Sequence, residues 1–415
     1  MLFENYGIPK EYCELDERIM GRCRDLFSEC ERVRDTVQLK VLDSFIRNRV
    51  GLQHLGQSTG YGYGDTARDT FDRVFADCVG AEDALCRPHI LSGTHALTVA
   101  LFGLLRTGDT LLAATGRPYD TLQPVIGLTG EGYGSLMDFG VRYDEVPLLN
   151  GEPDYEGIAR KAVSADVVHI QRSRGYESRR AFSLDDIRKI ADTVKAVNEK
   201  AVIFVDNCYG EFTDTEEPVL HGADLMAGSL IKNPGGAIAP TGGYIAGRAD
   251  LVERCAHRLT APGTGRELGS VPSGMRDFYL GLYFAPHVTC EAKKSSIYAA
   301  ALFEEIGYVA VPAFDQPRND IITSIETGSA ENLIALCEEI QASSPVDSFA
   351  SPVPDDMPGY DDKIIMAAGA FTQGSSIELS CDGPLREPYV AYLQGGISLA
   401  ASRLAMLRAA VRMRR

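Results

Sequence analysis

The hydrophobic residues of the chain follow two alternating patterns between residues 66 and 247. Short runs of valine, isoleucine, leucine and alanine predict strands, and the longer segments between them place apolar residues at helical spacing. The predicted strands cover residues 109–115, 141–148, 165–171, 200–207 and 242–247. Strands that are apolar almost throughout are typical of a parallel sheet with helices on both faces. The pattern therefore predicts an α/β domain whose ligand-binding loops lie at the carboxyl edge of a mostly parallel sheet.

The segment before this domain has a different pattern. Residues 11–50 are rich in charges and place apolar side chains at helical spacing, which predicts one or two amphipathic helices. A loop rich in glycine and tyrosine follows at 58–65. Its last residue, Asp65, or the adjacent Thr66 can cap the next helix, because either side chain can accept a hydrogen bond from an amide of the first turn.

The pattern changes again beyond about residue 265. A long helical region at 274–306 leads into a smaller α/β part, with strands expected at 321–327 and 375–383. The stretch 344–362 is rich in proline and aspartate and is expected to be an exposed loop. The last segment, 402–415, reads as a basic amphipathic helix. We expect it to be solvated, with a partner or lipid contact as the alternative.

These patterns divide the chain into three regions. A length of 415 residues is enough for two domains. We expect an N-terminal helical segment at 1–55, a large domain at 56–270, and a linking helix with a small C-terminal domain at 271–415.

Composition and charge narrow the class of protein. The chain has 58 acidic and 41 basic residues and a formal net charge of −17, which argues against the basic face that nucleic acids require. The N-terminus lacks the apolar core of a signal peptide, and the longest apolar run, 97–105, is too short to cross a bilayer. The ten cysteines include no C-x-x-C pair and no zinc-ligand spacing. These features predict a cytoplasmic enzyme with reduced thiols, no metal, and no nucleic-acid or membrane partner.

One lysine closes a short apolar run just before the chain turns sharply, in the stretch GSLIKNPGG at 228–236. This residue, Lys232, follows Leu230 and Ile231, and burial beside apolar groups favours the neutral, nucleophilic amine. Such an amine can form a Schiff base with pyridoxal phosphate, and the proline and glycines after it would leave space around the cofactor. The alternative is a lysine at a strand end with its ammonium group in water.

An aspartate ends the most hydrophobic strand of the chain. Asp206 follows the run AVIFV, and a carboxylate there is costly unless it is paired. The protonated pyridine nitrogen of pyridoxal phosphate would pair with it. Lys232 lies 26 residues further along (232 − 206), a distance that lets two adjacent strand ends face one site. The alternative is an aspartate that only caps the strand end.

A phosphate site is expected at the start of an apolar helix. Ser92, Gly93 and Thr94 open this helix, and helix N-termini offer free amides and a positive potential. Gly93 would let the backbone approach the phosphate closely, and Ser229 is placed to add a hydroxyl. An ordinary serine or threonine helix cap is the alternative.

Further side chains are candidates for the cofactor ring and the substrate. Tyr119 is a candidate for stacking on the pyridine ring. Gln171, Arg172 and Ser173 follow a strand, where they could reach the ring hydroxyl or the substrate. Arg386 has a planar guanidinium that suits an α-carboxylate, and a surface arginine in a loop is the alternative.

Four motifs together resemble one family. They are VDNCYGEF, GSLIKNPGG with its lysine 26 residues after the aspartate, SGTHA upstream, and IQRSRGY between them. In combination they are similar to the methionine γ-lyase family proteins once labelled aluminium-resistance proteins. The resemblance extends from the GYGYGD loop to DGPLREPY, and only the final segment, 398–415, departs from the expected family ending. It implies the fold-type-I fold of pyridoxal-phosphate enzymes, near the Cys/Met-metabolism group: a large domain with a mostly parallel, seven-stranded-type sheet and a small C-terminal α/β domain.

The resemblance also implies roles for individual residues. Lys232 becomes the Schiff-base lysine, Asp206 the partner of the pyridinium nitrogen, and Tyr119 the ring-stacking residue. Gly93, Thr94 and Ser229 are placed around the phosphate.

The resemblance further implies a homo-oligomer, either a dimer or a dimer of dimers, with an active site shared between two subunits. In the Cys/Met group a tyrosine and an arginine of the neighbouring subunit also touch the phosphate. The stretch GYGYGDTARD is similar to that segment, which nominates Tyr63 and Arg68.

The predicted activity is that of a pyridoxal-phosphate-dependent carbon–sulfur lyase. It would act on a sulfur-containing amino acid by β- or γ-elimination and release an α-keto acid, ammonia and a thiol. One alternative is another reaction on the same cofactor, such as transamination, γ-replacement or aldol cleavage. Another is a non-catalytic stress or metal-tolerance protein that binds the cofactor. A plain nucleotide-binding protein is disfavoured, because no G-x-G-x-x-G follows a strand and there is no P-loop.

Overall fold

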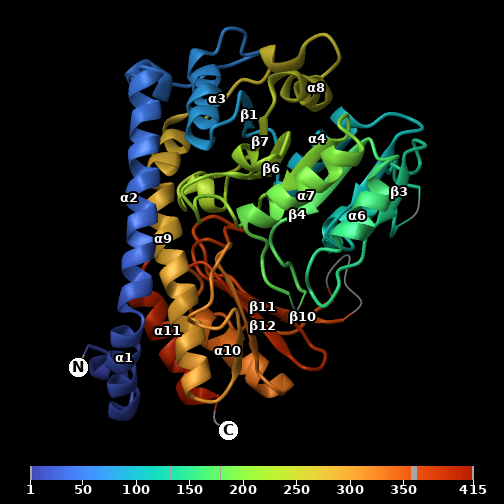
Figure 1. Ribbon diagram of the computed structural model, residues 1–415. Helices are drawn as coiled ribbons and strands as arrows, with labels where there is room; N and C mark the ends of the chain where they lie inside the picture. Colours follow the sequence, from blue (N-terminus) through green and yellow to red (C-terminus); the bar gives the residue numbers. More distant parts are fainter. Residues whose placement is uncertain (1, 131, 178, 357–361, 414–415) are drawn as a thin grey trace. The chain divides into compact units, whose positions relative to one another are not determined.

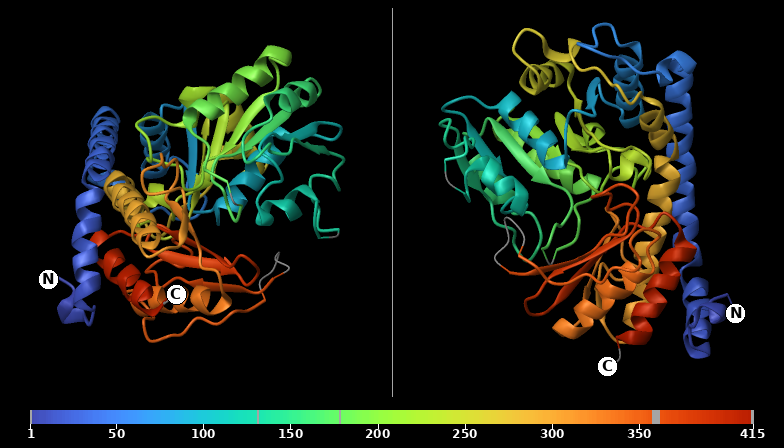
Figure 2. Two further views of the ribbon diagram at one scale, coloured as in Figure 1. Left: turned by 60° about the horizontal axis from the view of Figure 1, so that its bottom comes forward. Right: turned by 180° about the vertical axis from the view of Figure 1, so that it is seen from behind.

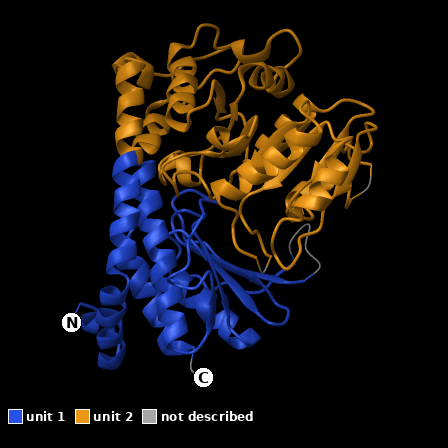
Figure 3. Ribbon diagram, in the orientation of Figure 1, with its two compact units in different colours: residues 1–36, 284–415 blue, residues 37–283 orange. Residues whose placement is uncertain are grey.

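The computed structural model describes residues 2–130, 132–177, 179–356 and 362–413 (Figure 1). The chain forms two compact units, one of residues 37–283 and one that joins residues 1–36 to 284–415 (Figure 3). Two helices, α2 (Arg24–Arg47) and α9 (Arg276–Glu305), run from one unit into the other. The predicted boundaries at 55 and 270 differ from this division, because the first helices pack into the same core as the C-terminal segments.

The unit of residues 37–283 contains a seven-stranded sheet with the order β1-β7-β6-β5-β4-β2-β3. Its strands are β1 (Asp83–Arg87), β2 (Thr110–Ala113), β3 (Arg142–Glu145), β4 (Val167–Gln171), β5 (Val202–Asp206), β6 (Leu225–Ser229) and β7 (Gly243–Gly247). Strands β2 to β6 pair in parallel, and β7 is antiparallel to both of its neighbours. The prediction of a mostly parallel sheet is confirmed.

Two strands of this sheet escaped the sequence pattern. β1 has the sequence DALCR and β6 has LMAGS, and neither is rich in β-branched residues. Both are buried strands whose conformation is stabilised by pairing with β7 rather than by local preference. The other five strands lie within the predicted runs.

The register of the strands decides which side chains share a face. Residues paired across neighbouring strands point to the same side, and side chains alternate along each strand. One face carries Phe204 of β5, Leu225 of β6 and Ile245 of β7, and it packs against α4 (Gly93–Leu104) and α8 (Ala249–Leu259). Figures 1 and 2 show α6 (Tyr155–Ala162) and α7 (Leu184–Val197) over the opposite face.

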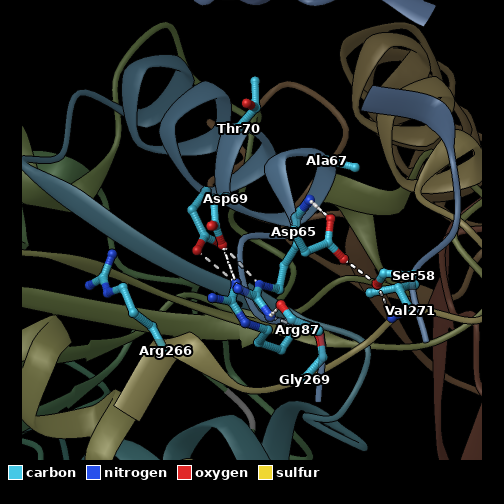
Figure 4. Close-up of polar contacts among 12 residues, drawn as sticks. Ser58, Asp65, Ala67, Asp69, Thr70, Arg87, Arg266, Gly269 and Val271 are labelled. Atoms are coloured by element: carbon cyan, nitrogen blue, oxygen red, sulfur yellow. Dashed lines mark hydrogen bonds and ion pairs between the residues drawn. The ribbon is translucent and has the colours of Figure 1, made fainter. Parts of the chain in front are cut away.

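Helix α3 (Thr66–Val79) begins at the glycine- and tyrosine-rich loop. The Asp65 carboxylate accepts a hydrogen bond from the Arg68 amide at 3.0 Å, so Asp65, and not Thr66, is the cap. The same carboxylate is hydrogen-bonded to the Ser58 hydroxyl, which ties both ends of the loop together (Figure 4).

The unit of residues 1–36 and 284–415, shown in blue in Figure 3, is called here the C-terminal unit. It contains a five-stranded antiparallel sheet with the order β10-β11-β12-β9-β8. Its strands are β8 (Val309–Val311), β9 (Ile322–Glu326), β10 (Ile364–Ala367), β11 (Ser380–Pro384) and β12 (Val390–Gln394). One face of this sheet packs with α10 (Ala330–Ala342) and α11 (Leu399–Arg412) around one hydrophobic core. The small C-terminal α/β part is thereby confirmed, and α1 (Lys10–Arg22) joins its core.

The terminal helix α11 corrects an expectation. We expected a solvated basic helix at 402–415, but Ala405, Met406, Leu407 and Ala410 are almost completely buried. The basic side chains lie on the other face, where Arg412 pairs with Glu338 and Glu339 of α10. The helix is therefore amphipathic, as predicted, but its apolar face is part of a core.

The predicted loop at 344–362 is exposed where the structure describes it. Phe349 and Val353 are 89% and 70% exposed, and residues 357–361 lie outside the described residues. All ten cysteines are free thiols and buried. Within the described ranges, no three His, Cys, Asp or Glu side chains gather as metal ligands, and no helix has the length and apolar content to cross a membrane.

A buried ion pair joins helices α1 and α11 of the C-terminal unit. The Arg403 guanidinium of α11 binds the Asp16 carboxylate of α1 through two hydrogen bonds, one of them 2.8 Å long. The Tyr298 hydroxyl of α9 donates to the same carboxylate at 2.8 Å. The Asp16 side chain is only 4% exposed, so loss of its partner would leave a buried, uncompensated charge.

We therefore expect Arg403→Met to lower the free energy of unfolding by about 3–5 kcal/mol. The measurement is urea denaturation of the full chain. The matched control is Arg32→Met, because Arg32 pairs with Glu29 on the exposed face of α2 and its loss should leave the midpoint unchanged. Equal midpoints for Arg403→Met and Arg32→Met would contradict the assignment.

Candidate active site

Two neighbouring strands end side by side at the carboxyl edge of the large sheet. Asp206 is the last residue of β5 and pairs in register with Ala227 of β6. Strand β6 ends at Ser229, and Lys232 precedes the short 3-10 turn η5 (Asn233–Gly235). The predicted geometry is therefore present, because the lysine and the aspartate come from adjacent strands and reach the same edge of the sheet.

The Lys232 ammonium is half-buried above an aromatic ring. Its nitrogen lies 3.7 Å from the centre of the Tyr209 ring, within the range of a cation–π contact. Burial disfavours the charged ammonium, but Cys208, Tyr209 and Asp206 around it outweigh burial and raise the pKa of Lys232. We had expected the apolar run before the lysine to favour the neutral amine. In the structure its acidic neighbours hold the proton instead.

The Asp206 side chain is buried and lies on the face of the sheet that packs against helix α4. Its Oδ1 accepts a hydrogen bond from the Cys208 amide at 3.1 Å. Two further residues of this face are Phe204 and, on β4, His169, whose rings lie 5.8 Å apart. Burial lowers the pKa of His169 to about 4, against the opposing effect of Asp206, and its Nε2 has no hydrogen-bond partner in the described structure. A neutral histidine behind the aspartate was not predicted, because its position depends on strand register.

The N-terminus of α4 meets the ends of β5 and β6. Ser92 caps this helix by accepting a hydrogen bond from the His95 amide at 3.1 Å. A Cβ atom on Gly93 would lie 3.1 Å from Cys208 Sγ and 3.6 Å from Ser229 Cβ, so a larger residue would crowd this junction. The Gly93 and Thr94 amides have no acceptor within the helix, which suits an anion. The structure thus brings the predicted phosphate residues and Ser229 together.

Tyr119 is held next to β4 through its backbone. Its amide donates to Gln171 Oε1 at 2.7 Å, and Gln171 Nε2 donates to the Ser173 carbonyl at 3.1 Å. Gly175 passes so close that a Cβ atom there would lie 2.8 Å from the Tyr119 ring. Gln171 is the register partner of Asp206, so this arrangement positions Tyr119 beside the same strand ends. Gln171 and the Ser173 carbonyl therefore orient the tyrosine loop. The expected contacts of Gln171 and Ser173 with a cofactor or substrate stay a prediction.

Arg172 does not have the surroundings expected of a substrate ligand. Its side chain is 1% exposed, and its Nη1 donates to Asn207 Oδ1 at 2.8 Å and to the Gly210 carbonyl at 3.0 Å. The Glu217 carboxylate lies 3.8 Å from the same nitrogen. These hydrogen bonds to Asn207 and Gly210 hold the loop after β5 against Arg172. The expectation that Arg172 binds substrate is not supported, because its guanidinium is enclosed by the protein.

Tyr63 and Arg68 have opposite surroundings. Tyr63 is 65% exposed and contacts the Tyr61 ring at a centroid distance of 5.7 Å. Arg68 is buried, and its Nη1 donates to the carbonyls of Gly62 and Gly269 at 3.1 and 3.0 Å. Figure 4 shows the polar contacts around this loop. The arginine therefore stabilises the loop that presents the tyrosines, and we do not expect it to reach a phosphate.

Arg386 lies in the other unit of the chain. It is exposed and forms an ion pair with Asp362 at 3.1 Å. Its role in binding a substrate carboxylate stays a prediction.

Asn233 ties the lysine loop to the loop after β5. Its Nδ2 donates to the carbonyls of Tyr209 and Glu211 at 3.1 and 2.9 Å, and the residue is fully buried. Tyr209 has a φ of 70°, in the left-handed region that costs energy for a residue other than glycine. Asn233 helps to hold this strained backbone, which places the Tyr209 ring under the lysine. Sequence reasoning passed over Asn233, although it directly follows the lysine.

After Lys232 the backbone packs so closely that there is no room for a side chain at Gly235. A Cβ atom on Gly235 would lie 1.8 Å from the Leu230 carbonyl oxygen, and a Cβ atom on Gly281 of α9 would lie 2.3 Å from the Gly235 carbonyl oxygen. We had expected the glycines after Lys232 to leave space around a cofactor. The structure shows that Gly235 lets the chain turn back on itself against α9, and the space around a cofactor stays a prediction.

We expect Gly235→Ala to lower the free energy of unfolding by about 3 kcal/mol or more, because the clash is with backbone that cannot move aside. Urea denaturation of the full chain measures the effect. Gly21→Ala, in an open position within α1, is the control and should raise stability by roughly 0.5–1 kcal/mol. A Gly235→Ala variant as stable as the parent chain would refute this account of the turn.

Fold and site define a class of protein. The large and small sheets have the fold of the fold-type-I pyridoxal-phosphate-dependent enzymes. Two distant structures have this fold: the pyridoxal-5'-phosphate-dependent protein YhfS of Escherichia coli and the methionine gamma lyase CalE6 of Micromonospora echinospora. Their TM-scores are 0.62 and 0.58 at 18% and 17% identity.

The chain belongs to the methionine gamma-lyase family, whose sequence model matches residues 12–414. The match includes the C-terminal segment that we expected to depart from the family. Among curated proteins, the uncharacterized protein YnbB of Bacillus subtilis is 45% identical over 394 residues, which is 94% of this chain and 93% of YnbB.

Solved structures of similar proteins agree over nearly the whole chain. A Clostridium novyi protein described as a carbon-sulfur lyase involved in aluminum resistance is 47% identical, with a TM-score of 0.95, and the match covers 99% of this chain and 98% of that one. A Listeria monocytogenes protein is 46% identical, with a TM-score of 0.94 and coverage of 95% and 98%. It has the provisional name cystathionine beta-lyase involved in aluminum resistance.

Proposed function

We propose that this protein is a cytoplasmic, pyridoxal-phosphate-dependent carbon–sulfur lyase that acts on a sulfur-containing amino acid. The observation that carries the proposal is the meeting of Lys232 and Asp206 at adjacent strand ends, beside the N-terminus of α4. Family membership and the names of the similar Clostridium and Listeria proteins support this reaction class. Ten free, buried cysteines fit a reducing compartment.

The residues at this edge fit the three polar parts of the cofactor. Lys232 would hold its aldehyde carbon, Asp206 its pyridine nitrogen, and the first turn of α4 with Ser229 its phosphate. The buried His169 Nε2, which lacks a partner, lies on the same sheet face. When bound, the cofactor supplies an electron sink for the charge that develops at the substrate Cα.

The protein would supply proton transfer and positioning. Lys232, as a free amine, would accept the Cα proton of the substrate as a general base. Asp206 would keep a proton on the pyridine nitrogen, because its buried carboxylate is stabilised by that positive charge. Tyr119, anchored through Gln171, would lie against the ring and fix its tilt.

The position of the sulfur in the substrate decides how many proton transfers are needed. If the thiol leaves from Cβ, loss of the Cα proton is enough. If it leaves from Cγ, a second proton must be taken from Cβ, and Lys232 is the nearest candidate base. Hydrolysis of the remaining enamine would then give the α-keto acid and ammonia in both cases.

We also propose that the protein acts as a homo-oligomer, with Tyr63 directed toward the site of a second copy. The support is the loop at 58–65, which is fixed at its base by Arg68 and Ser58 and presents Tyr61 and Tyr63 outward. A rigid, exposed pair of aromatic side chains is typical of an interface.

Reduction of the holoprotein with borohydride, followed by peptide mass spectrometry, should place the pyridoxyl group on Lys232. The Lys232→Ala variant should lose both this adduct and the absorbance of the lysine-bound cofactor. The control is Lys161→Ala, because Lys161 is a surface residue paired with Asp144 and its loss should change neither. An adduct on another lysine would refute the assignment of Lys232.

Turnover should be measured with methionine, homocysteine, cystathionine, cysteine and threonine, by assay of keto acid, ammonia and thiol in the same sample. We expect equal amounts of the three products from at least one sulfur-containing substrate. Asp206→Asn should lower kcat/KM by at least about 100-fold, because the charge on the pyridine nitrogen is lost. Asp144→Asn, on β3 in the surface ion pair with Lys161, serves as the control.

Holoprotein that turns over none of the five amino acids would contradict the lyase assignment. It would favour a non-catalytic cofactor-binding protein. Keto acid without thiol would instead favour another reaction on the same cofactor.

A further inference from the structure

A second carboxyl group is buried next to the lysine loop, and the proposed mechanism does not use it. Glu211, in the loop after β5, is 1% exposed. Its Oε1 accepts a hydrogen bond from the Tyr244 hydroxyl at 2.8 Å, and its Oε2 has no partner in the described structure. Its donors in the described structure, the Tyr244 hydroxyl and its own backbone amide, are both neutral, so the buried carboxylate is poorly compensated and the geometry favours the protonated acid.

The fold encloses this pair beneath the strand that leads to Lys232. A Cβ atom on Gly228 of β6 would lie 2.7 Å from both Glu211 Oε1 and the Tyr244 hydroxyl, so only glycine leaves room for the pair. Asn233 binds the Glu211 carbonyl at 2.9 Å. Gly228 therefore packs against the Glu211–Tyr244 pair, and Asn233 is hydrogen-bonded to the Glu211 backbone. In the sequence, Lys232 lies between these two residues.

The charged and titratable groups around Glu211 come from several elements. Tyr244 belongs to β7, Glu217 to the segment after the β5 loop, and Lys232 to the loop after β6. Glu217 is itself balanced by Arg172, its partner at 3.8 Å. Burial raises the pKa of Glu211 to about 8, and the charge of Lys232 acts in the opposite direction. Asp206, Cys208 and Tyr209 act on Lys232 from the other side.

We propose that Glu211 and Lys232 form a coupled pair in which the charge state of one governs the proton affinity of the other, with Tyr244 holding the carboxyl in place. While Glu211 is neutral, one negative charge fewer acts on Lys232, and the lysine can release its proton more readily. Ionisation of Glu211 adds a negative charge and holds the proton on the lysine. Glu211 is thus a positioning residue that sets the pH range in which the amine is reactive. The functional meaning rests on the proposed role of Lys232.

Thermal unfolding of the apoprotein tests the state of Glu211 directly. The folded chain keeps a proton on Glu211 from the unfolded pKa of about 4.5 up to about 8, and the unfolded chain does not. This contribution to stability is therefore lost as the pH rises through that window. Glu211→Gln mimics the neutral acid at every pH. The Tm of Glu211→Gln relative to the parent should rise steadily between pH 5 and pH 8.

The control is Glu145→Gln, which alters a similar carboxyl–tyrosine pair on β3. The Tyr143 hydroxyl donates to Glu145 at 2.6 Å, and three strands separate β3 from β6. Its Tm difference should not change with pH in this way. If Glu211→Gln does not fold, Tyr244→Phe provides the second variant. It removes the hydroxyl that donates to the carboxyl and so raises the pKa of Glu211 further. The fall in stability with rising pH should then continue to a higher pH than in the parent.

Carbamylation of Lys232 by cyanate in the apoprotein, followed by mass spectrometry from pH 6 to pH 11, tests the coupling. Above about pH 8, where Glu211 is ionised in the parent, Glu211→Gln should be labelled roughly tenfold faster, which corresponds to a pKa of Lys232 about one unit lower. Below that pH the variant and the parent should be labelled at the same rate. By reciprocity, Lys232→Met should raise the pH at which Glu211 ionises, seen as a wider window of falling Tm. Glu145→Gln should leave both unchanged.

An unchanged rate of Lys232 labelling above about pH 8 in Glu211→Gln would overturn the proposal and leave Glu211 a structural residue. Because both measurements use apoprotein, this failure is separate from failure of the lyase assignment, which the borohydride adduct and product assays decide.

Discussion

The candidate site depends on the contact between two backbone loops, the one after β5 and the one after β6. Asn233 makes this contact by donating to the Tyr209 and Glu211 carbonyls, and Gly235 allows the sharp turn that brings Asn233 into reach. Without this contact the Tyr209 backbone would have little reason to stay in the left-handed region. The ring under Lys232 and the carboxyl beneath β6 both depend on the same pair of hydrogen bonds.

Two layers of polar groups follow from this contact. Asp206, His169 and Ser229 lie on the sheet face that packs against α4, where the helix N-terminus supplies positive potential. Glu211 and Tyr244 lie beneath Gly228 of β6. Lys232 lies over the Tyr209 ring, and Cys208, Tyr209 and Asp206 raise its pKa. Its protonation is therefore a property of the assembled site, and the apolar residues before it in the sequence do not decide it.

Local sequence determined much of the fold and the centre of the site. The apolar runs predicted five strands of the large sheet and its parallel character, because a strand buried on both faces must be apolar almost throughout. Asp206 and Lys232 stood out because a charged residue at the end of such a run needs a partner. The Ser92 cap and Asp65 cap followed from the same local chemistry of helix ends.

Only the tertiary structure decided which polar residues face one another. Arg172 and Arg68 carry charges that suit an anion, yet both are buried and donate to backbone carbonyls, which no spacing reveals. Asn233, His169 and Glu211 gained their roles through strand register and loop contact, which join residues far apart in sequence. The sequence alone determined which residue types stand at the strand ends, because burial restricts them locally. The surroundings that set their protonation depend on long-range packing, so they appeared only in the folded chain.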